Sequence, residues 1–193
     1  MIGFNALGRM GRLANQMFQY ASLKGIARNV GADIIVPYYK DAVDDGIGNK
    51  LRSELFDSFN PNVNIGVLNN GNAPVVQERF FHFDENFFNI LDNTDVNGYL
   101  QSEKYFKHIE SEIRNDFTFY NRTYDMTSNY INGMFPNSEV ISMHVRRTDY
   151  TTDDGFECLS LDYYESALQK LPNLPVLILS DDPNWCKNYF KSE

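Results

Sequence analysis

The sequence predicts an α/β protein built from two halves, each organised around a parallel sheet. The first indication is a strand–helix–strand pattern near the N-terminus, over residues 1–38. The second is a pair of apolar runs, residues 140–143 and 175–180, separated by an amphipathic helix. Strands that are apolar along their whole length are typical of parallel sheets covered on both faces.

The N-terminal pattern begins with a short strand over residues 1–7 and a glycine-containing turn at Gly8 and Gly11. Apolar residues then recur at helical spacing until Gly31 ends the helix, and residues 32–38 form the next strand. A glycine turn before a helix directs unpaired backbone N–H groups and the positive end of the helix dipole toward a bound anion. Arg12 lies beside that turn.

The middle of the chain predicts a loop with a short helix over residues 40–72, where an acceptor-recognising insertion could lie. We expect a strand over residues 75–83, a helix over 102–117 with Ser102 as N-cap, and a helix over 122–134. The turn at Pro136 predicts a boundary between a domain of residues 1–136 and one of residues 137–193.

In the second half, strands over 139–147 and 175–180 flank a helix over 161–171. Since the carboxyl ends of parallel strands share one sheet edge, we expect Arg146 and Asp182 to meet there. Ligands of such sheets bind at this edge, which makes it the candidate site.

Composition limits the class of partner. The 193 residues carry 17 basic and 26 acidic side chains, a net charge of −9, which opposes binding to nucleic acid. No apolar run approaches the ~18 residues of a membrane span, so we expect no membrane insertion. Cys158 and Cys186 lack zinc-ligand spacing and are expected to be free thiols. These features predict a cytoplasmic protein.

The stretch His144-Val145-Arg146-Arg147-Thr148-Asp149-Tyr150 carries the most chemical information. Arginine stays charged and presents a planar fork of donors that matches phosphate oxygens. Two arginines beside a His and an Asp at a strand end therefore indicate a nucleotide diphosphate site. The alternative is a surface ion pair.

This stretch closely resembles the first motif of the α-1,2-fucosyltransferases, glycosyltransferase family 11, and of related fucosyltransferases. Three other stretches resemble family segments in the same order along the chain: GRLANQMFQYA (11–21), GYLQSEKYF (98–106) and LSDDPNW (179–185). Ala14 replaces the glycine usual in the family, and no Ser/Trp-rich third motif follows before Glu193.

The resemblance implies two Rossmann-like halves in a GT-B-like fold, the C-terminal one incomplete, with the active site in an interdomain cleft. It implies inverting, metal-independent transfer of L-fucose from GDP-β-L-fucose to a glycan hydroxyl, α-1,2 to galactose, with no cofactor. Arg146 would bind the β-phosphate and act in catalysis. Asp149 is a second catalytic candidate because its carboxylate lies close to the arginine pair in the sequence. The residues expected to bind the donor are Arg12, Asn15, Gln16, His144, Arg147 and Asp182.

Several alternatives stay open. Asp149 is either the general base for the acceptor hydroxyl or the counter-ion that orients the arginines. Asn15 and Gln16 either face the donor or cap the first helix.

The whole chain is either an active enzyme or a truncated member that binds nucleotide or glycan without turnover. If the chain is complete, we expect self-association through its C-terminal half, because a sheet edge or apolar face would lie uncovered. An NAD-type oxidoreductase is disfavoured, because Gly8 and Gly11 do not complete a G-x-G-x-x-G pattern.

Overall fold

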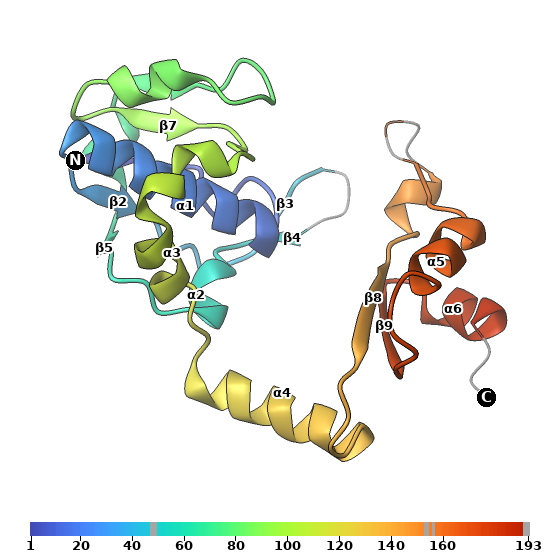
Figure 1. The fold of residues 1–193 in the computed structure, drawn as a ribbon. Coiled ribbons are helices and arrows are strands. Elements are labelled where there is room, and N and C mark those ends of the chain that lie inside the picture. Colours follow the sequence, from blue (N-terminus) through green and yellow to red (C-terminus); the bar gives the residue numbers. More distant parts are fainter. Residues whose placement is uncertain (47–49, 153–154, 156, 191–193) are drawn as a thin grey trace. The chain divides into compact units, whose positions relative to one another are not determined.

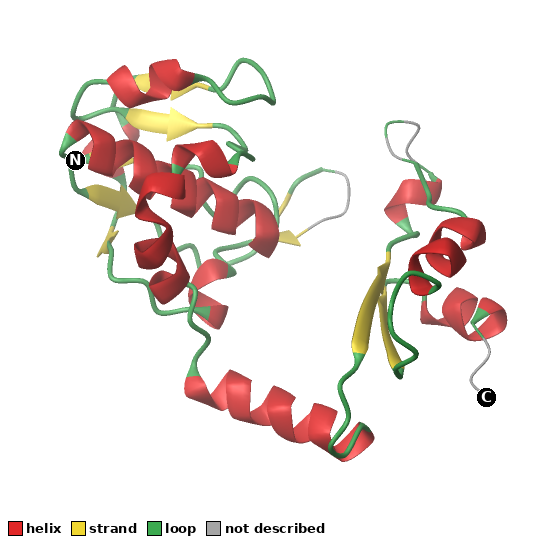
Figure 2. Ribbon diagram, viewed as in Figure 1, coloured by secondary structure: helices red, strands yellow, loops and turns green. Residues whose placement is uncertain are grey.

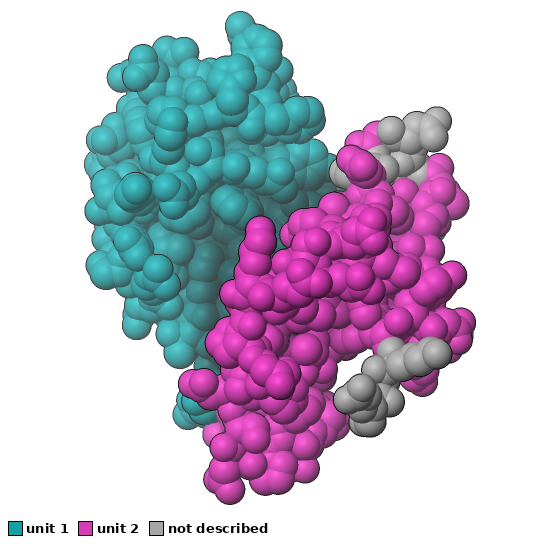
Figure 3. All heavy atoms as spheres, turned by 45° about the vertical axis from the view of Figure 1, so that its right-hand side comes forward, with its two compact units in different colours: residues 1–124 teal, residues 125–193 magenta. Residues whose placement is uncertain are grey.

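The computed structural model describes residues 1–46, 50–152, 155 and 157–190. The chain forms two compact units, Met1–Tyr124 and Asp125–Glu193, which are coloured separately in Figure 3. The division falls inside helix α4 (Asn121–Met134), whereas the boundary expected from the sequence follows that helix. Because α4 has no buried residue, little packing decides which unit it belongs to.

Unit 1 contains a five-stranded sheet in the order β5-β2-β1-β7-β6, and every neighbouring pair is parallel. The strands and helices of this unit can be followed in Figures 1 and 2. The strands are β1 (Ile2–Gly3), β2 (Ile34–Val36), β5 (Asn64–Ile65), β6 (Val75–Gln77) and β7 (Asp95–Asn97). A separate antiparallel pair joins β3 (Val43–Asp44) to β4 (Lys50–Leu51).

Helix α1 (Leu13–Val30) connects β1 to β2 and packs against the core, as the apolar spacing predicted. Gly31 ends it in the left-handed conformation, with φ of 71°. Gly25 allows close approach, because a Cβ there would lie 2.1 Å from the Tyr105 carbonyl oxygen. Tyr20, Leu23 and Ile26 are fully buried, and a buried side chain of this size contributes ~1.5–3 kcal/mol.

The middle of unit 1 differs from the sequence expectation. The region expected as loop does contain a short helix, α2 (Leu55–Ser58), but it also contributes β5 to the main sheet. Strand β7 was not predicted, and β6 ends at Gln77 rather than at residue 83. The helix expected over 102–117 divides into 3-10 turns at Glu103–Tyr105 and Lys107–Ile109 followed by α3 (Glu110–Asp116). Further 3-10 turns are Leu68–Gly71 and Glu85–Asn89 in this unit, and Asp149–Thr151 in unit 2.

Unit 2 contains β8 (Ile141–Val145), α5 (Leu161–Leu168), β9 (Val176–Ser180) and α6 (Pro183–Tyr189). The two strands pair in parallel, with Ile141 opposite Val176 and Val145 opposite Ser180. In Figure 1 both helices lie on the same side of this pair. Met143 and Val145 pack with Tyr164 of α5 and Cys186 of α6.

The expectation that these strands are covered on both faces is wrong for the described residues. Leu179 of β9 is 51% exposed, and Ser142 and His144 of β8 are exposed as well. The reason is that both α5 and α6 pack against the other face, so neither of these helices covers this one. This exposed side of the β8–β9 pair is called the open face below.

Candidate functional site

The two motifs of unit 2 leave the sheet side by side. Because Val145 is in register with Ser180, the chain continues from the adjacent strands into Arg146 and Asp181. The parallel arrangement thus brings the arginine pair and the two aspartates to one edge, as the sequence predicted.

Asp181 holds the arginine loop against the end of β9. Its carboxylate accepts hydrogen bonds from the Arg147 backbone N–H, at 2.9 Å, and from the Thr148 hydroxyl, at 2.7 Å. Burial raises the pKa of Asp181, but these hydrogen bonds outweigh it and hold the pKa below the ordinary value. The carboxylate is therefore ionised at neutral pH and fixes the loop. The sequence did not single out Asp181 for this role.

Arg147 is the inner arginine of the pair. Its Nε donates to Asp182 at 3.4 Å, and its guanidinium lies over the Trp185 ring at 4.0 Å from the ring centre. Arg146 and Asp182 lie at the same sheet edge, as expected, but the neighbouring Arg147 makes the direct contact with Asp182. Successive residues of an extended chain point to opposite sides, so only one of two adjacent arginines can turn toward α6.

Arg146 is the outer arginine, with a side chain 43% exposed against 22% for Arg147. Its Nε donates to Asp149 at 3.0 Å, its second nitrogen contacts the other carboxylate oxygen, and its guanidinium lies 5.0 Å from the centre of the Tyr150 ring. The hydrogen bond from Arg146 lowers the pKa of Asp149, and the same bond raises the pKa of Arg146. This geometry is that of a counter-ion.

His144 lies on the open face, opposite Leu179 in the register of the two strands. Its backbone neighbours Met143 and Val145 are buried on the other side. His144 is therefore accessible to a ligand, but strand pleating turns its side chain away from the packed face that holds Tyr164 and Cys186. Among the described residues there is no cluster of three or more His, Cys, Asp or Glu side chains that could hold a metal ion.

The glycine turn of unit 1 lies at the carboxyl end of β1. Gly8 and Gly11 have φ of 85° and 76°, and a Cβ at Gly8 would lie 2.4 Å from the Ser53 hydroxyl oxygen. The backbone N–H of Leu13, at the start of α1, donates to the Glu54 carboxylate at 2.8 Å. The chain's own carboxylate thus takes the position in which the sequence predicted a bound anion.

Gln16 braces this turn from inside. Its side chain is fully buried, its amide nitrogen donates to the carbonyls of Gly11 and Arg52, and its amide oxygen accepts from the N–H groups of Glu54 and Leu55. A buried amide with both ends satisfied has no donor to offer a ligand. The geometry favours a structural role for Gln16 over donor binding, although its bonds are not those of a helix cap.

Asn15 and Arg12 are more accessible than Gln16. The Asn15 amide oxygen accepts a hydrogen bond of 2.7 Å from Gln101, which links α1 to the loop after β7. Arg12 is exposed at the N-cap of α1, and its side chain makes no capping hydrogen bond. Both residues lie at the carboxyl edge of the unit 1 sheet, where ligands of parallel sheets bind.

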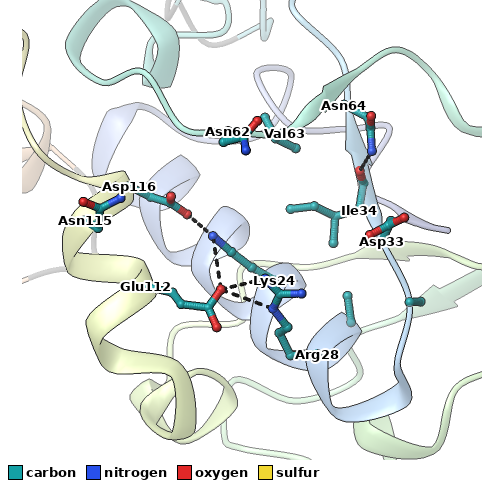
Figure 4. Close-up of a pocket in the computed structure, with 12 residues that line it drawn as sticks. Lys24, Arg28, Asp33, Ile34, Asn62, Val63, Asn64, Glu112, Asn115 and Asp116 are labelled. Carbon is teal, nitrogen blue, oxygen red and sulfur yellow. Dashed lines mark hydrogen bonds and ion pairs between the residues drawn. The ribbon is translucent and has the colours of Figure 1, made fainter.

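A pocket of about 300 Å³ lies between α1, α3 and the starts of β2 and β5. Figure 4 shows Lys24 and Arg28 directed at Glu112, with Asp116 on the other side of Lys24. Asp116 also accepts a 2.7 Å hydrogen bond from the buried Tyr20 hydroxyl. These charges are paired among themselves at the amino edge of the sheet, so we interpret the cluster as structural.

The structure thus defines an α/β protein with a parallel sheet and, in unit 2, an arginine-rich edge suited to an anion. Glycosyl transferase family 11 matches residues 1–193, and the chain belongs to this family.

Curated relatives carry related names. The chain is 25% identical to the galactoside 2-alpha-L-fucosyltransferase SEC1 of Bos taurus, over 98% of this chain and 53% of that protein. It is also 25% identical to an alpha-1,2-colitosyltransferase of Escherichia coli, over 93% of this chain and 69% of that protein. The chain spans about half the length of the mammalian relatives that it matches.

A solved structure has a similar fold. The NodZ alpha-1,6-fucosyltransferase soaked with GDP-fucose superposes with a TM-score of 0.54 at 13% identity, over 97% of this chain and 73% of that chain. This likeness confirms a mixed α/β fold with a parallel sheet. Among the helices that the structure describes, none has the length and apolar character to cross a membrane.

Proposed function

We propose that this chain takes part in transfer of L-fucose from GDP-β-L-fucose to a galactose hydroxyl, forming an α-1,2 linkage. The match to glycosyl transferase family 11 over residues 1–193 carries this proposal. The names of the mammalian relatives support the galactoside acceptor, and the NodZ structure soaked with GDP-fucose supports the donor. The GT-B-like arrangement of two halves, the second incomplete, and the cytoplasmic location stay predictions.

Arg146 is the proposed anchor of the donor diphosphate. It is the more exposed of the two arginines, and its guanidinium pairs with the half-exposed Asp149. A phosphate oxygen can bind a guanidinium through the same planar fork that now binds the carboxylate. Arg147 is held by Asp182 and Trp185, and we propose that it contributes charge and fixes the shape of the edge.

Asp182 is the proposed reader of guanine, together with His144. A carboxylate can accept from both N1–H and N2–H of guanine, which adenine and uracil do not offer in that arrangement. Asp182 already accepts from the Trp185 backbone N–H at 3.1 Å, which fixes one of its oxygens. Guanine would therefore have to share the carboxylate with α6 and Arg147.

The proposed reaction is a single displacement. The acceptor hydroxyl oxygen bonds to the anomeric carbon of fucose as the bond from that carbon to the diphosphate oxygen breaks, so the β-linked sugar becomes α-linked. The electron pair leaves with GDP, and Arg146 stabilises the developing charge without a metal ion. The hydroxyl proton passes to a base, and Asp149 would serve only if Arg146 shifted to the phosphate and released it.

The alternative is a family member that binds nucleotide or glycan without turnover. It keeps the Arg146 and Asp182 predictions but expects no GDP release. A GDP-release assay with GDP-fucose and lactose separates the two functions, because transfer frees GDP whereas binding does not. One relative is named for the transfer of a different sugar, colitose, so recognition of the sugar has to be tested separately from recognition of the nucleotide. Comparing the affinity for GDP-fucose with the affinity for GDP alone does this.

Calorimetric titration with GDP, ADP and UDP in EDTA tests the donor site. We expect GDP binding without metal, and loss of about 1–3 kcal/mol of binding free energy in Arg146→Lys, which keeps the charge but loses the fork. Arg114→Lys is the matched control, since Arg114 pairs with Glu110 on the surface of unit 1. Equal GDP affinity in wild type and a folded Arg146→Ala variant would remove Arg146 from the donor site.

A further inference from the structure

Exposed aromatic side chains gather on the loop that follows β6. Phe80 is 60% exposed and Phe81 is 84% exposed, the highest exposed fraction of any large hydrophobic side chain described. The Phe80 ring stacks on His82, with ring centres 5.2 Å apart and an angle of 18° between the planes. Phe81 lies near Tyr99, at 6.5 Å between ring centres. We name Phe80, Phe81, His82 and Tyr99 the aromatic platform.

The loop that carries the platform is anchored at both ends. Before it, the Glu78 carboxylate accepts hydrogen bonds from the N–H groups of Tyr99, at 2.6 Å, and Leu100, at 3.1 Å. After it, the Asp84 N–H donates to the hydroxyl of the buried Tyr105 at 2.8 Å. Clusters of rings usually pack into a core. Here a fixed backbone holds them out to solvent, which indicates a binding surface.

The platform lies at the carboxyl edge of the unit 1 sheet. It follows β6 and β7, which are parallel neighbours, and β7 points toward this edge in Figure 1. Gln101, two residues after Tyr99, bonds to Asn15 in the first turn of α1. The platform therefore belongs to the edge at which the glycine turn and Arg12 also lie.

The chemistry of the platform fits a sugar better than a purely apolar partner. A galactose ring has one face of C–H groups, which packs on aromatic rings, and a rim of hydroxyls, which need hydrogen-bonding groups. The rings of Phe80 and Phe81 can meet the first requirement. The Tyr99 hydroxyl, the His82 ring and the Gln101 amide can meet the second.

We propose that the aromatic platform binds the terminal galactose of the acceptor. This inference rests on the proposed function and deepens it, because it assigns acceptor recognition to the loops after β6 and β7. The sequence analysis had named residues 40–72 as a segment where an acceptor-recognising insertion could lie.

The test is titration of the 193-residue protein with lactose, which ends in galactose, and with maltose, which does not. Binding is followed by calorimetry and by saturation-transfer NMR on the sugar protons. We expect Phe80→Ala and Phe81→Ala each to raise the Kd for lactose roughly threefold to tenfold, the scale of losing one aromatic contact. Leu91→Ala is the matched control, because Leu91 is 80% exposed but precedes β7 at the opposite edge of the sheet.

Both variants should keep the GDP affinity of the wild type, because Arg146 and Asp182, the residues proposed to bind the diphosphate and guanine, lie in unit 2. Equal lactose affinity in Phe81→Ala and wild type, or no preference of the wild type for lactose over maltose, would overturn the proposal. So would loss of self-association in Phe81→Ala without a change in lactose binding, since the platform would then be a protein interface. If GDP binds neither the wild type nor the variants, the proposed function is contradicted. The platform is tested separately, because lactose binding is measured without nucleotide.

Discussion

Adjacent arginines with the same sequence context take different roles in this chain. Arg147 is fixed between Asp182 and Trp185, whereas Arg146 is exposed and bound to Asp149. The motif predicted an arginine pair at a sheet edge, and that is confirmed. Which arginine is fixed and which is exposed could not be predicted, because it depends on which of the two faces the Trp185 ring. That ring comes from a helix far along the sequence.

The Arg146–Asp149 pair should make a small contribution to folding stability that depends on pH. The hydrogen bond from Arg146 holds the pKa of Asp149 below its ordinary value of 3.8. A lowered folded-state pKa means that the pair's stabilisation is complete above that ordinary value and is lost as the pH falls through the folded-state pKa. Both side chains are about half exposed, so the effect on unfolding is small.

NMR titration of the Asp149 carboxyl carbon measures the pKa of Asp149 directly. In the Arg146→Gln variant the pKa of Asp149 should return toward its ordinary value, while that of Asp181, which is held by Thr148 and the backbone, should change less. An Asp149 titration that is the same in both proteins would show that the ion pair does not form in solution.

At the scale of elements, the N-termini of α1 and α6 are both capped by carboxylates of the chain itself. Glu54 receives the Leu13 N–H of α1, and Asp182 receives the Trp185 N–H of α6. The glycine turn before α1 could be predicted from Gly8 and Gly11. The sequence could not show that the Glu54 carboxylate, rather than a bound anion, accepts from this turn, because Glu54 lies in a segment expected to be loop.

Gln16 provides a test of the turn's internal support. Gln16→Ala removes an amide that serves the carbonyls of Gly11 and Arg52 and the N–H groups of Glu54 and Leu55. Leaving such groups unsatisfied costs ~1–3 kcal/mol each, so we expect a loss of at least about 2 kcal/mol in the free energy of unfolding. Urea denaturation measures the loss, with Gln77→Ala as control, since Gln77 is exposed and its amide bonds to the carbonyl of the adjacent Glu78. A loss below about 0.5 kcal/mol would mean that water replaces the amide.

Asp182 combines the cap of α6 with the proposed reading of guanine, and two substitutions separate these roles. Asp182→Ala should lower the unfolding free energy by about 1 kcal/mol through loss of the cap, whereas Asp182→Asn should keep most of the stability, since Asn caps well. Asp182→Asn should still lose the preference for GDP over ADP and UDP, because an amide cannot accept both guanine donors. An equal loss for all three nucleotides in Asp182→Asn would assign Asp182 to structure alone.

At the scale of the whole molecule, the predictable elements are those whose apolar pattern is local. The segments β1-α1-β2 and β8-α5-β9 carry long apolar runs or clear helical spacing, and both were predicted. Strands β5 and β7 were missed because they are short and carry Asn64, Asp95 and Asn97. Their conformation comes from backbone pairing with β2, β1 and β6, which are distant in sequence.

The exposed Leu179 of the open face and the outer edge of β9 lead to a prediction about assembly. Leu179 is 51% exposed beside a groove of about 830 Å³ lined also by Ile178, Pro183 and Phe190. The outer edge of β9 carries no further strand among the described residues. An apolar groove next to a strand edge favours contact with another chain. We therefore expect the 193-residue protein to self-associate through unit 2.

Sedimentation velocity over a range of protein concentrations tests this expectation. Leu179→Lys should shift the protein toward monomer, because a charge in the groove would lose solvation on association. Leu171→Lys is the control, since Leu171 is 48% exposed but does not line the groove. A wild-type protein that is monomeric at every concentration would contradict the prediction, as would equal association in both variants, which would place the interface elsewhere on the chain.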